Sequence, residues 1–247
     1  MKEQEEKFML PIEETFVSIQ GEGSEIGVKT FFIRVQGCAV GCKHCDTKYA
    51  WHVNKDSYLP IEGLVRAAQK KNCQSVSITG GEPGHYPEDV IALVEQLNSV
   101  GLSVSVETSG KRQFYGFYED LDNYRKDKDV SICMDIKTPC TGVSGIDDFD
   151  NLKFMRLGDN VKCLIDTEED LYWAYEVNKK LGGRCEMILQ PFRKPVVDEG
   201  ERIYMCEHLV SEYKDLVEKF INDEREWKWT RVTPQMHVLL YYGMRGY

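Results

Sequence analysis

Segments rich in β-branched and aromatic residues alternate along this chain with segments that have helical periodicity. Such an order is typical of parallel strands joined by crossover helices. We expect seven strands, at residues 30–36, 75–79, 103–107, 130–136, 160–165, 185–190 and 227–232. The alternation therefore predicts an α/β fold built on one largely parallel sheet.

Apolar residues at helical spacing occupy several of the intervening segments. One helix is expected after Pro87, with Gly101 as its stop. A second is expected from Thr167, which forms a capping-box pattern with Asp170, to Gly182. A longer helix carries one apolar stripe, formed by Ile203, Cys206, Val210, Tyr213, Val217 and Phe220.

The 247 residues suffice for one large α/β domain or for two small ones. No internal repeat or low-complexity linker marks a boundary, so we favour a single domain over residues 1–247. Six or seven β/α units fit a barrel or an open partial barrel, because a full barrel of eight units usually takes about 250 residues. We expect a single-domain partial (β/α) barrel with its site at the carboxyl ends of the strands.

Composition and charge exclude several classes of function. The net charge of −10 repels nucleic-acid phosphates and favours a small or cationic partner. No apolar run reaches the roughly 18 to 20 residues that a membrane span needs, and the start of the chain is too acidic for a secretory signal. We expect a cytoplasmic protein that binds neither nucleic acid nor membrane.

Polar motifs follow most of the expected strands. These are GCAVGCKHC, GGEPGHY, TSG, KTPCTG, PFRK and PQMH. Each one alone fits an ordinary turn, in which glycine supplies an unusual backbone conformation. Because the carboxyl ends of parallel strands meet at one edge of the sheet, we expect the six motifs to form a common site there.

Three of the nine cysteines lie within eight positions, at Cys38, Cys42 and Cys45. A structural zinc site needs four protein ligands, and the chain has no second cysteine pair. A [4Fe–4S] cluster held by three thiolates keeps one iron open for a substrate or cofactor. Non-enzymatic binding of zinc or of a cluster remains the alternative. We expect the other six cysteines to be packing residues, namely Cys73, Cys133, Cys140, Cys163, Cys185 and Cys206.

The CxxxCxxC motif, followed by GGEP at residues 80–83, resembles the radical S-adenosylmethionine enzymes. In these enzymes the open iron chelates the amino and carboxylate groups of S-adenosylmethionine, and an electron from the cluster cleaves the sulfonium to a 5′-deoxyadenosyl radical. The resemblance implies that the three clustered cysteines hold the cluster. It also implies a set of cofactor-binding residues, formed by His44, Asp46, Gly80, Gly81, Glu82, Asp135, Ile136, Lys137, Gln190 and Pro191.

Four further motifs narrow the resemblance: SIQGEG at 18–23, RVQGC at 34–38, CDT at 45–47 and TPQMH at 233–237. Together they resemble the 7-carboxy-7-deazaguanine synthases over nearly the whole chain. That family converts 6-carboxy-5,6,7,8-tetrahydropterin to 7-carboxy-7-deazaguanine with loss of ammonia, in queuosine and 7-deazapurine biosynthesis, and uses Mg²⁺. The resemblance implies a radical core domain with short substrate-binding extensions at both ends.

The same resemblance implies the substrate site. Its members are Ile19, Gln20, Gly21, Glu22, Arg34, Thr79 and His237, of which Glu22, Arg34 and His237 are expected to be catalytic. A guanidinium suits the pterin carboxylate, although a surface ion pair is the commoner fate of an arginine. Thr47 is implied as a Mg²⁺ ligand, against the alternative of a capping residue.

The resemblance also extends to partners. We expect a homodimer, partly because the apolar residues LLYY near the end of the sequence need cover. An electron donor such as flavodoxin or ferredoxin is expected to reduce the cluster. Two alternatives stay open: a glycyl-radical activating enzyme that acts on a protein partner, and a non-catalytic iron–sulfur protein.

Overall fold

The computed structural model describes residues 8–43, 45–192 and 202–241. These residues build a nine-stranded sheet in the order β3-β1-β2-β4-β5-β6-β7-β8-β9. The strands are β1 (Met9–Ile19), β2 (Lys29–Val35), β3 (Tyr58–Pro60), β4 (Ser75–Gly80), β5 (Ser103–Thr108), β6 (Val130–Asp135), β7 (Asn160–Ile165), β8 (Glu186–Pro191) and β9 (Thr230–Val232).

Strand β2 and strands β4 to β9 run parallel, which confirms the predicted parallel sheet. The sequence did not predict β1, which pairs antiparallel with β2, or β3, which pairs antiparallel with β1. The last expected strand, at 227–232, is shorter than predicted. Trp229 has a φ of 43°, outside the strand region. The ring of Trp227 instead packs edge-on against Phe220 and Tyr175.

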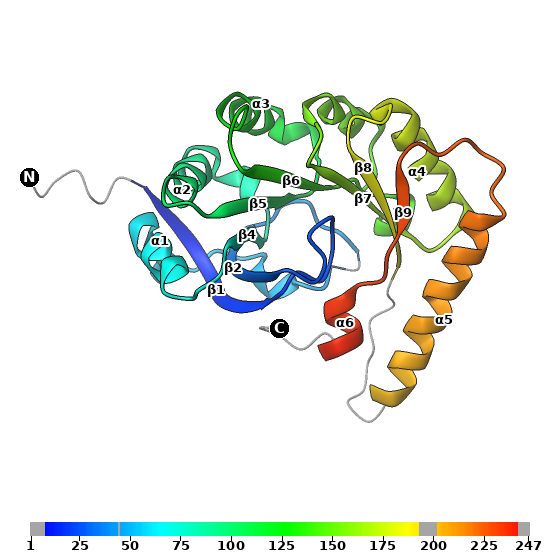
Figure 1. Ribbon diagram of the computed structural model, residues 1–247, viewed down its shortest axis with the longest axis horizontal. Coiled ribbons are helices and arrows are strands. Elements are labelled where there is room, and N and C mark those ends of the chain that lie inside the picture. The colour runs from blue at the N-terminus through cyan, green and yellow to red at the C-terminus, as the bar shows by residue number, and fades with distance from the viewer. Residues whose placement is uncertain (1–7, 44, 193–201, 242–247) are drawn as a thin grey trace, which may run out of the picture.

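Six α-helices accompany the described strands. They are α1 (Ile61–Gln69), α2 (Pro87–Ser99), α3 (Tyr115–Tyr124), α4 (Glu168–Leu181), α5 (Arg202–Ile221) and α6 (Met236–Tyr241). Figure 1 shows α1 to α4 around one side of the curved sheet and α6 on the opposite side. This is the expected partial barrel of parallel strands and crossover helices.

The predicted helix signals explain where α2 and α4 begin. In α4 both halves of the capping box form, since the Thr167 hydroxyl accepts from the Asp170 amide and the Asp170 carboxylate accepts from the Thr167 amide. Pro87 is the first residue of α2.

On α5 the expected apolar stripe is wrong at Val210, which is 57% exposed, while Leu216 is buried at 4%.

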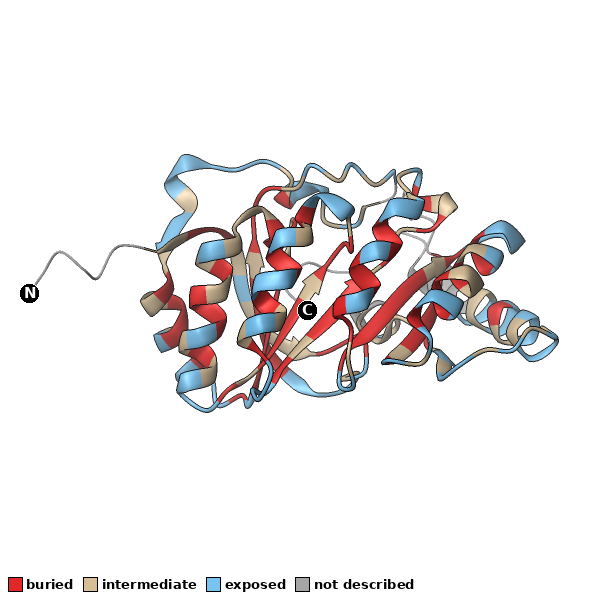
Figure 2. Ribbon diagram, turned by 90° about the horizontal axis from the view of Figure 1, so that it is seen from above, coloured by how far each residue is buried: buried red, intermediate tan, exposed pale blue. Residues whose placement is uncertain are grey.

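The core lies between the sheet and the four covering helices. Figure 2 shows buried residues in the strands and on the sheet-facing sides of these helices, with exposed residues outside. Four expected packing cysteines are buried, and they are Cys73, Cys133, Cys163 and Cys185. Cys140 is only half-buried, and the side chain of Cys206 lies outside the described residues. Among the described helices, none has the length and apolarity to cross a bilayer.

Candidate active site

A cavity of about 480 Å³ lies at the carboxyl ends of the parallel strands. It is lined by segments that follow β2, β4, β5, β6 and β8, by the turn after β1, and by residues near α6. Most of the residues predicted for the site line it: Ile19, Gln20, Gly21, Glu22, Arg34, Cys38, Cys42, Cys45, Asp46, Thr47, Thr79, Gly80, Gly81, Glu82, Asp135, Lys137 and His237.

Three predicted cofactor residues do not line this cavity, namely Ile136, Gln190 and Pro191. Ile136 lies between Asp135 and Lys137, and its side chain is 1% exposed in the core because alternate residues of an extended chain point to opposite faces. Gln190 is fully buried and lies 3.4 Å from the Thr233 hydroxyl through its amide nitrogen. His44 lies outside the described residues.

The cysteine-bearing loop leaves β2 and is fixed by backbone hydrogen bonds. The Cys38 amide donates to the Trp51 carbonyl at 3.2 Å, and the Lys43 amide donates to the Thr141 carbonyl at 2.9 Å. The indole N–H of Trp51 donates to the sulfur of Cys45 at 3.3 Å. The cysteine loop is therefore tied both to the chain that follows it and to the segment around Thr141.

The three clustered thiols share one cavity wall, and their surroundings change the pKa of two of them. Burial raises the pKa of Cys38 and of Cys42, and charge on the neighbouring sulfurs raises both further. A bound cationic metal cluster would lower the pKa of these cysteines, because a thiol that coordinates metal loses its proton. Their placement around the open end of the barrel therefore fits a cluster that has one iron open to a ligand.

The GGEP loop packs directly on the backbone of the cysteine loop. The Gly81 amide donates to the Val35 carbonyl at 2.8 Å, and the Glu82 amide donates to the Gly37 carbonyl at 2.9 Å. A Cβ on Gly81 would lie 2.2 Å from the Gly37 oxygen, so no larger residue fits. The close approach of two loops explains the glycine in this motif.

Glu82 is buried at 1% and holds the loop that follows β5. Its carboxylate accepts hydrogen bonds from the Gly84 amide at 2.9 Å, the Thr108 hydroxyl at 2.6 Å and the Ser109 amide at 2.8 Å. An ionised carboxylate has about four acceptor sites, so one remains for a ligand.

The cavity is also lined by residues that the sequence analysis did not assign to the site, among them Glu107, Lys162 and Gln235. The carboxylate of Glu107 accepts from Gln20 at 2.9 Å and from the Thr79 hydroxyl at 2.8 Å. Its position in the sequence could have revealed Glu107, because this residue ends an expected strand and directly precedes the TSG motif. Lys162 lies inside an apolar strand, where an isolated charge is unusual without a partner.

Arg34 lies on the cavity wall beside the rings of Phe16 and Tyr49. Its Nε donates to the Glu14 carboxylate at 2.9 Å, and its Cζ lies 5.8 Å from the ring centroid of Phe16. Phe16 stacks on Phe32 with centroids 4.9 Å apart. The Arg34 side chain is only 15% exposed, so the pair with Glu14 is not a surface ion pair. That bond uses one of the five N–H donors of a guanidinium.

The turn after β1 meets the segment that carries α6. The Met236 amide donates to the Gly21 carbonyl at 2.9 Å, and Gln235 hydrogen-bonds Glu22. A Cβ on Gly21 would lie 2.1 Å from Nδ1 of His237. The fold thus brings together the two predicted substrate segments from opposite ends of the sequence.

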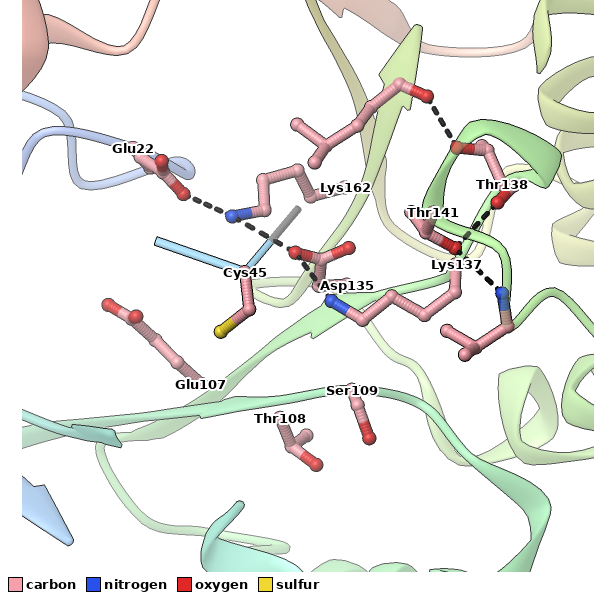
Figure 3. A network of polar contacts seen from close by, with 12 residues as sticks. Glu22, Cys45, Glu107, Thr108, Ser109, Asp135, Lys137, Thr138, Thr141 and Lys162 are labelled. Carbon is pink, nitrogen blue, oxygen red and sulfur yellow. Dashed lines mark hydrogen bonds and ion pairs between the residues drawn. The ribbon is translucent and has the colours of Figure 1, made fainter. Parts of the chain in front are cut away.

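Four alternating charges cross the cavity in Figure 3: Glu22, Lys162, Asp135 and Lys137. The carboxylate of Asp135 lies 3.1 Å from the Lys137 ammonium and 3.3 Å from that of Lys162, which also pairs with Glu22. Burial works to raise the pKa of Glu22, but the charges of Lys162 and His237 outweigh it and lower this pKa to about 2. Glu22 is therefore ionised at neutral pH.

Comparison with known proteins assigns the fold and the site to a family. The Radical SAM superfamily matches residues 32–166, more than half of the chain. The 7-carboxy-7-deazaguanine synthase of Methanospirillum hungatei is 34% identical over 185 residues, which cover 74% of this chain and 72% of that protein. The chain belongs to the 7-carboxy-7-deazaguanine synthase family. Both resemblances drawn from the motifs are thereby confirmed.

Other relatives agree with this assignment. The 7-carboxy-7-deazaguanine synthase of Thermoplasma acidophilum is 32% identical over 73% of this chain and 81% of its own length. The crystal structure of QueE from Escherichia coli shares the fold, with a TM-score of 0.64, 22% identity and coverage of 93% of this chain and 95% of that one. Membership of the radical SAM superfamily implies an enzyme that uses a [4Fe–4S] cluster and S-adenosylmethionine.

Proposed function

We propose that this chain is a Mg²⁺-dependent lyase that converts 6-carboxy-5,6,7,8-tetrahydropterin to 7-carboxy-7-deazaguanine with loss of ammonia, in queuosine and 7-deazapurine biosynthesis. The observation that carries the proposal is one cavity in which the three clustered thiols share the wall with Arg34 and Glu22. A cation and an anion in one cavity match a substrate that carries a carboxylate and an N–H-rich ring edge. The names of the relatives support the same reaction.

Cys38, Cys42 and Cys45 would hold the cluster. Bound together, the cluster and S-adenosylmethionine would supply the carbon-centred radical that removes a hydrogen atom from the pterin. Lys137 suits the carboxylate of S-adenosylmethionine, and Asp135 suits hydroxyl donors. The remaining proposed contacts to this cofactor in the cavity are Asp46, Gly80, Gly81 and Glu82. We also propose His44, Ile136, Gln190 and Pro191, which the resemblance of the motifs implies.

On the substrate side, Arg34 would pair with the pterin carboxylate through its terminal nitrogens, while Glu14 keeps Nε in place. Glu22, ionised at neutral pH, would accept N–H groups of the ring. The stacked rings of Phe16 and Phe32 give the bicycle an apolar wall.

The other substrate contacts we propose are Ile19, Gln20, Gly21, Thr79 and His237, all of which line the cavity. His237 would hydrogen-bond the substrate or carry a proton. Its position against Gly21 holds the imidazole beside the turn that carries Glu22. The catalytic residues of the proposal are Glu22, Arg34 and His237.

Thr47 would contribute its hydroxyl to Mg²⁺. Its Oγ1 lies 3.4 Å from the sulfur of Cys45, on the wall of the same cavity. Mg²⁺ takes hard oxygen ligands and keeps several waters, so one protein hydroxyl with substrate oxygens forms a suitable shell. A metal there would lie close to both the cluster loop and the substrate.

We also propose that residues 1–247 form one radical SAM core domain, whose ends act as short substrate-binding extensions. The contacts of Gly21 with Met236 and His237 support this assignment. A homodimer and an electron donor such as flavodoxin or ferredoxin complete the proposal.

The test is anaerobic incubation of the reconstituted protein with the carboxypterin, S-adenosylmethionine, Mg²⁺ and a reductant, followed by mass analysis. We expect 7-carboxy-7-deazaguanine and ammonia, with the Cys42→Ala variant as the inactive control. Cleavage of S-adenosylmethionine that the carboxypterin does not stimulate would contradict the proposal. It would point instead to an activating enzyme for a protein partner.

A further inference from the structure

Lys162 joins the two sides of the cavity. It comes from β7, an inner strand of the sheet, and its ammonium contacts the Asp135 carboxylate at 3.3 Å and pairs with Glu22. Asp135 ends β6 on the proposed cofactor side, whereas Glu22 belongs to the turn after β1 on the proposed substrate side. Figure 3 shows the ammonium between the two carboxylates. One cation therefore serves both binding regions.

The four side chains form a neutral, mostly buried set of two cations and two anions. Their exposed fractions are 14% for Glu22, 11% for Lys162, 18% for Asp135 and 14% for Lys137. Removing charges from water is costly, so each depends on its neighbours for compensation. A ligand that pairs with one of these four side chains therefore changes how well the charges of the other three are balanced.

The acceptor atoms of Asp135 are unevenly used. Both lysines contact its Oδ2, while its Oδ1 is buried and has no hydrogen-bond partner among the described residues. A buried orphan acceptor on a cavity wall costs free energy until a donor reaches it. The carboxylate can accordingly gain an interaction with Lys162 when Lys137 turns toward an anionic ligand.

We infer that Lys162 is a positioning residue that couples the binding of cofactor and pterin. The inference rests on the proposed function. N–H groups of the pterin satisfy Glu22, which releases the Lys162 ammonium to Asp135. Lys137 is then released from Asp135 and can pair with the carboxylate of S-adenosylmethionine. Each ligand strengthens the binding of the other, because coupling between two sites is reciprocal.

A lysine with only a structural role would behave differently. Its loss would lower stability and weaken both ligands, but the ratio of pterin affinities with and without S-adenosylmethionine would stay as in the wild type. The ratio, rather than activity, therefore distinguishes coupling from simple support of the fold.

The experiment is anaerobic calorimetric titration of carboxypterin into the reconstituted full-length protein, without reductant so that no turnover occurs. Titrations are made with and without saturating S-adenosylmethionine. For the wild type we expect the cofactor to tighten pterin binding by about 5-fold or more. Lys162→Met should reduce this ratio to about 1, and Lys162→Arg should restore part of it. Lys179→Met, at an exposed lysine on α4, is the matched control and should keep the wild-type ratio.

If Lys162→Met does not fold, Glu22→Gln provides the test, because it removes the charge at the substrate-side end of the set of four charges. The ratio of pterin affinities with and without S-adenosylmethionine should also be about 1 for this variant. A ratio near 1 in the wild type, or an unchanged ratio in a folded variant, overturns the inference and leaves the proposed function standing. Failure of the wild type to bind carboxypterin under either condition overturns the proposed function, and the inference with it.

Discussion

Gly21 lies so close to His237 that a Cβ at this glycine would fall 2.1 Å from the imidazole Nδ1. Gly21→Ala should therefore push His237 and the segment around it out of place. We expect kcat/KM for the pterin to fall by about 10²-fold, the scale of a misplacement of about 1 Å, while iron content stays normal. Gly116→Ala is the control, because nothing lies within 4 Å of a Cβ there and helix α3 tolerates alanine. Equal activity in the two variants would contradict the contact.

Arg34→Ala should leave the pterin carboxylate unpaired. The substrate should bind more weakly by roughly 2 to 5 kcal/mol, since the guanidinium is mostly buried on the cavity wall. Cluster assembly should survive, as shown by iron–sulfur absorbance. Arg66→Ala, at an exposed position on α1, serves as the control. Unchanged pterin affinity would limit Arg34 to its ion pair with Glu14.

Thr47→Ala should raise the Mg²⁺ concentration needed for half-maximal turnover by about tenfold, because water replaces a positioned hydroxyl only imperfectly. Binding of S-adenosylmethionine, measured by calorimetry, should be nearly unaffected. Thr47→Ser keeps the hydroxyl and is expected to behave as the wild type. A Mg²⁺ titration that does not shift would make Thr47 a local capping residue.

Cys42→Ala should abolish cluster assembly. Anaerobic reconstitution of the wild type should give about four irons per chain, and the variant should show neither iron nor the absorbance of the cluster. Cys140→Ala is the matched control, because this half-buried cysteine does not line the cavity. Stoichiometric zinc in the wild type, without iron–sulfur absorbance after reconstitution, would contradict the cluster.

Lowering the pH should remove the contribution that the ion pair between Glu22 and Lys162 makes to the stability of the folded protein. The pKa of Glu22 is lowered from 4.5 to about 2 in the folded protein, so its contribution to stability is complete above pH 4.5 and is lost as the pH falls toward 2. Between about pH 6 and about pH 3, the free energy of unfolding in urea should fall more steeply for the wild type than for Glu22→Gln. Parallel pH profiles would show that the pair with Lys162 does not lower the pKa of Glu22.

The sequence predicted the parallel strands and the cysteine loop well, because buried apolar runs and ligand spacing are local patterns. Strand β1 was missed, since it carries the charged pair Glu13 and Glu14 and gains its stability from pairing with β2. Lys162 was missed for a related reason, and Gln235 was not singled out although it lies in the TPQMH motif. Their significance depends on partners that are distant in the sequence, and no local pattern marks such a pair.

The hydrogen bond between Gln235 and Glu22 joins residues separated by 213 positions. During synthesis, the segments that carry the three cysteines and the GGEP loop emerge long before this contact can form. The proposed substrate residues are thus divided between the two ends of the sequence, with Glu22 and Arg34 ahead of the cysteines and His237 far behind them. A chain that ends before Gln235 would keep the three clustered cysteines and Glu22 but would lack the contact that joins the turn after β1 to the segment of α6.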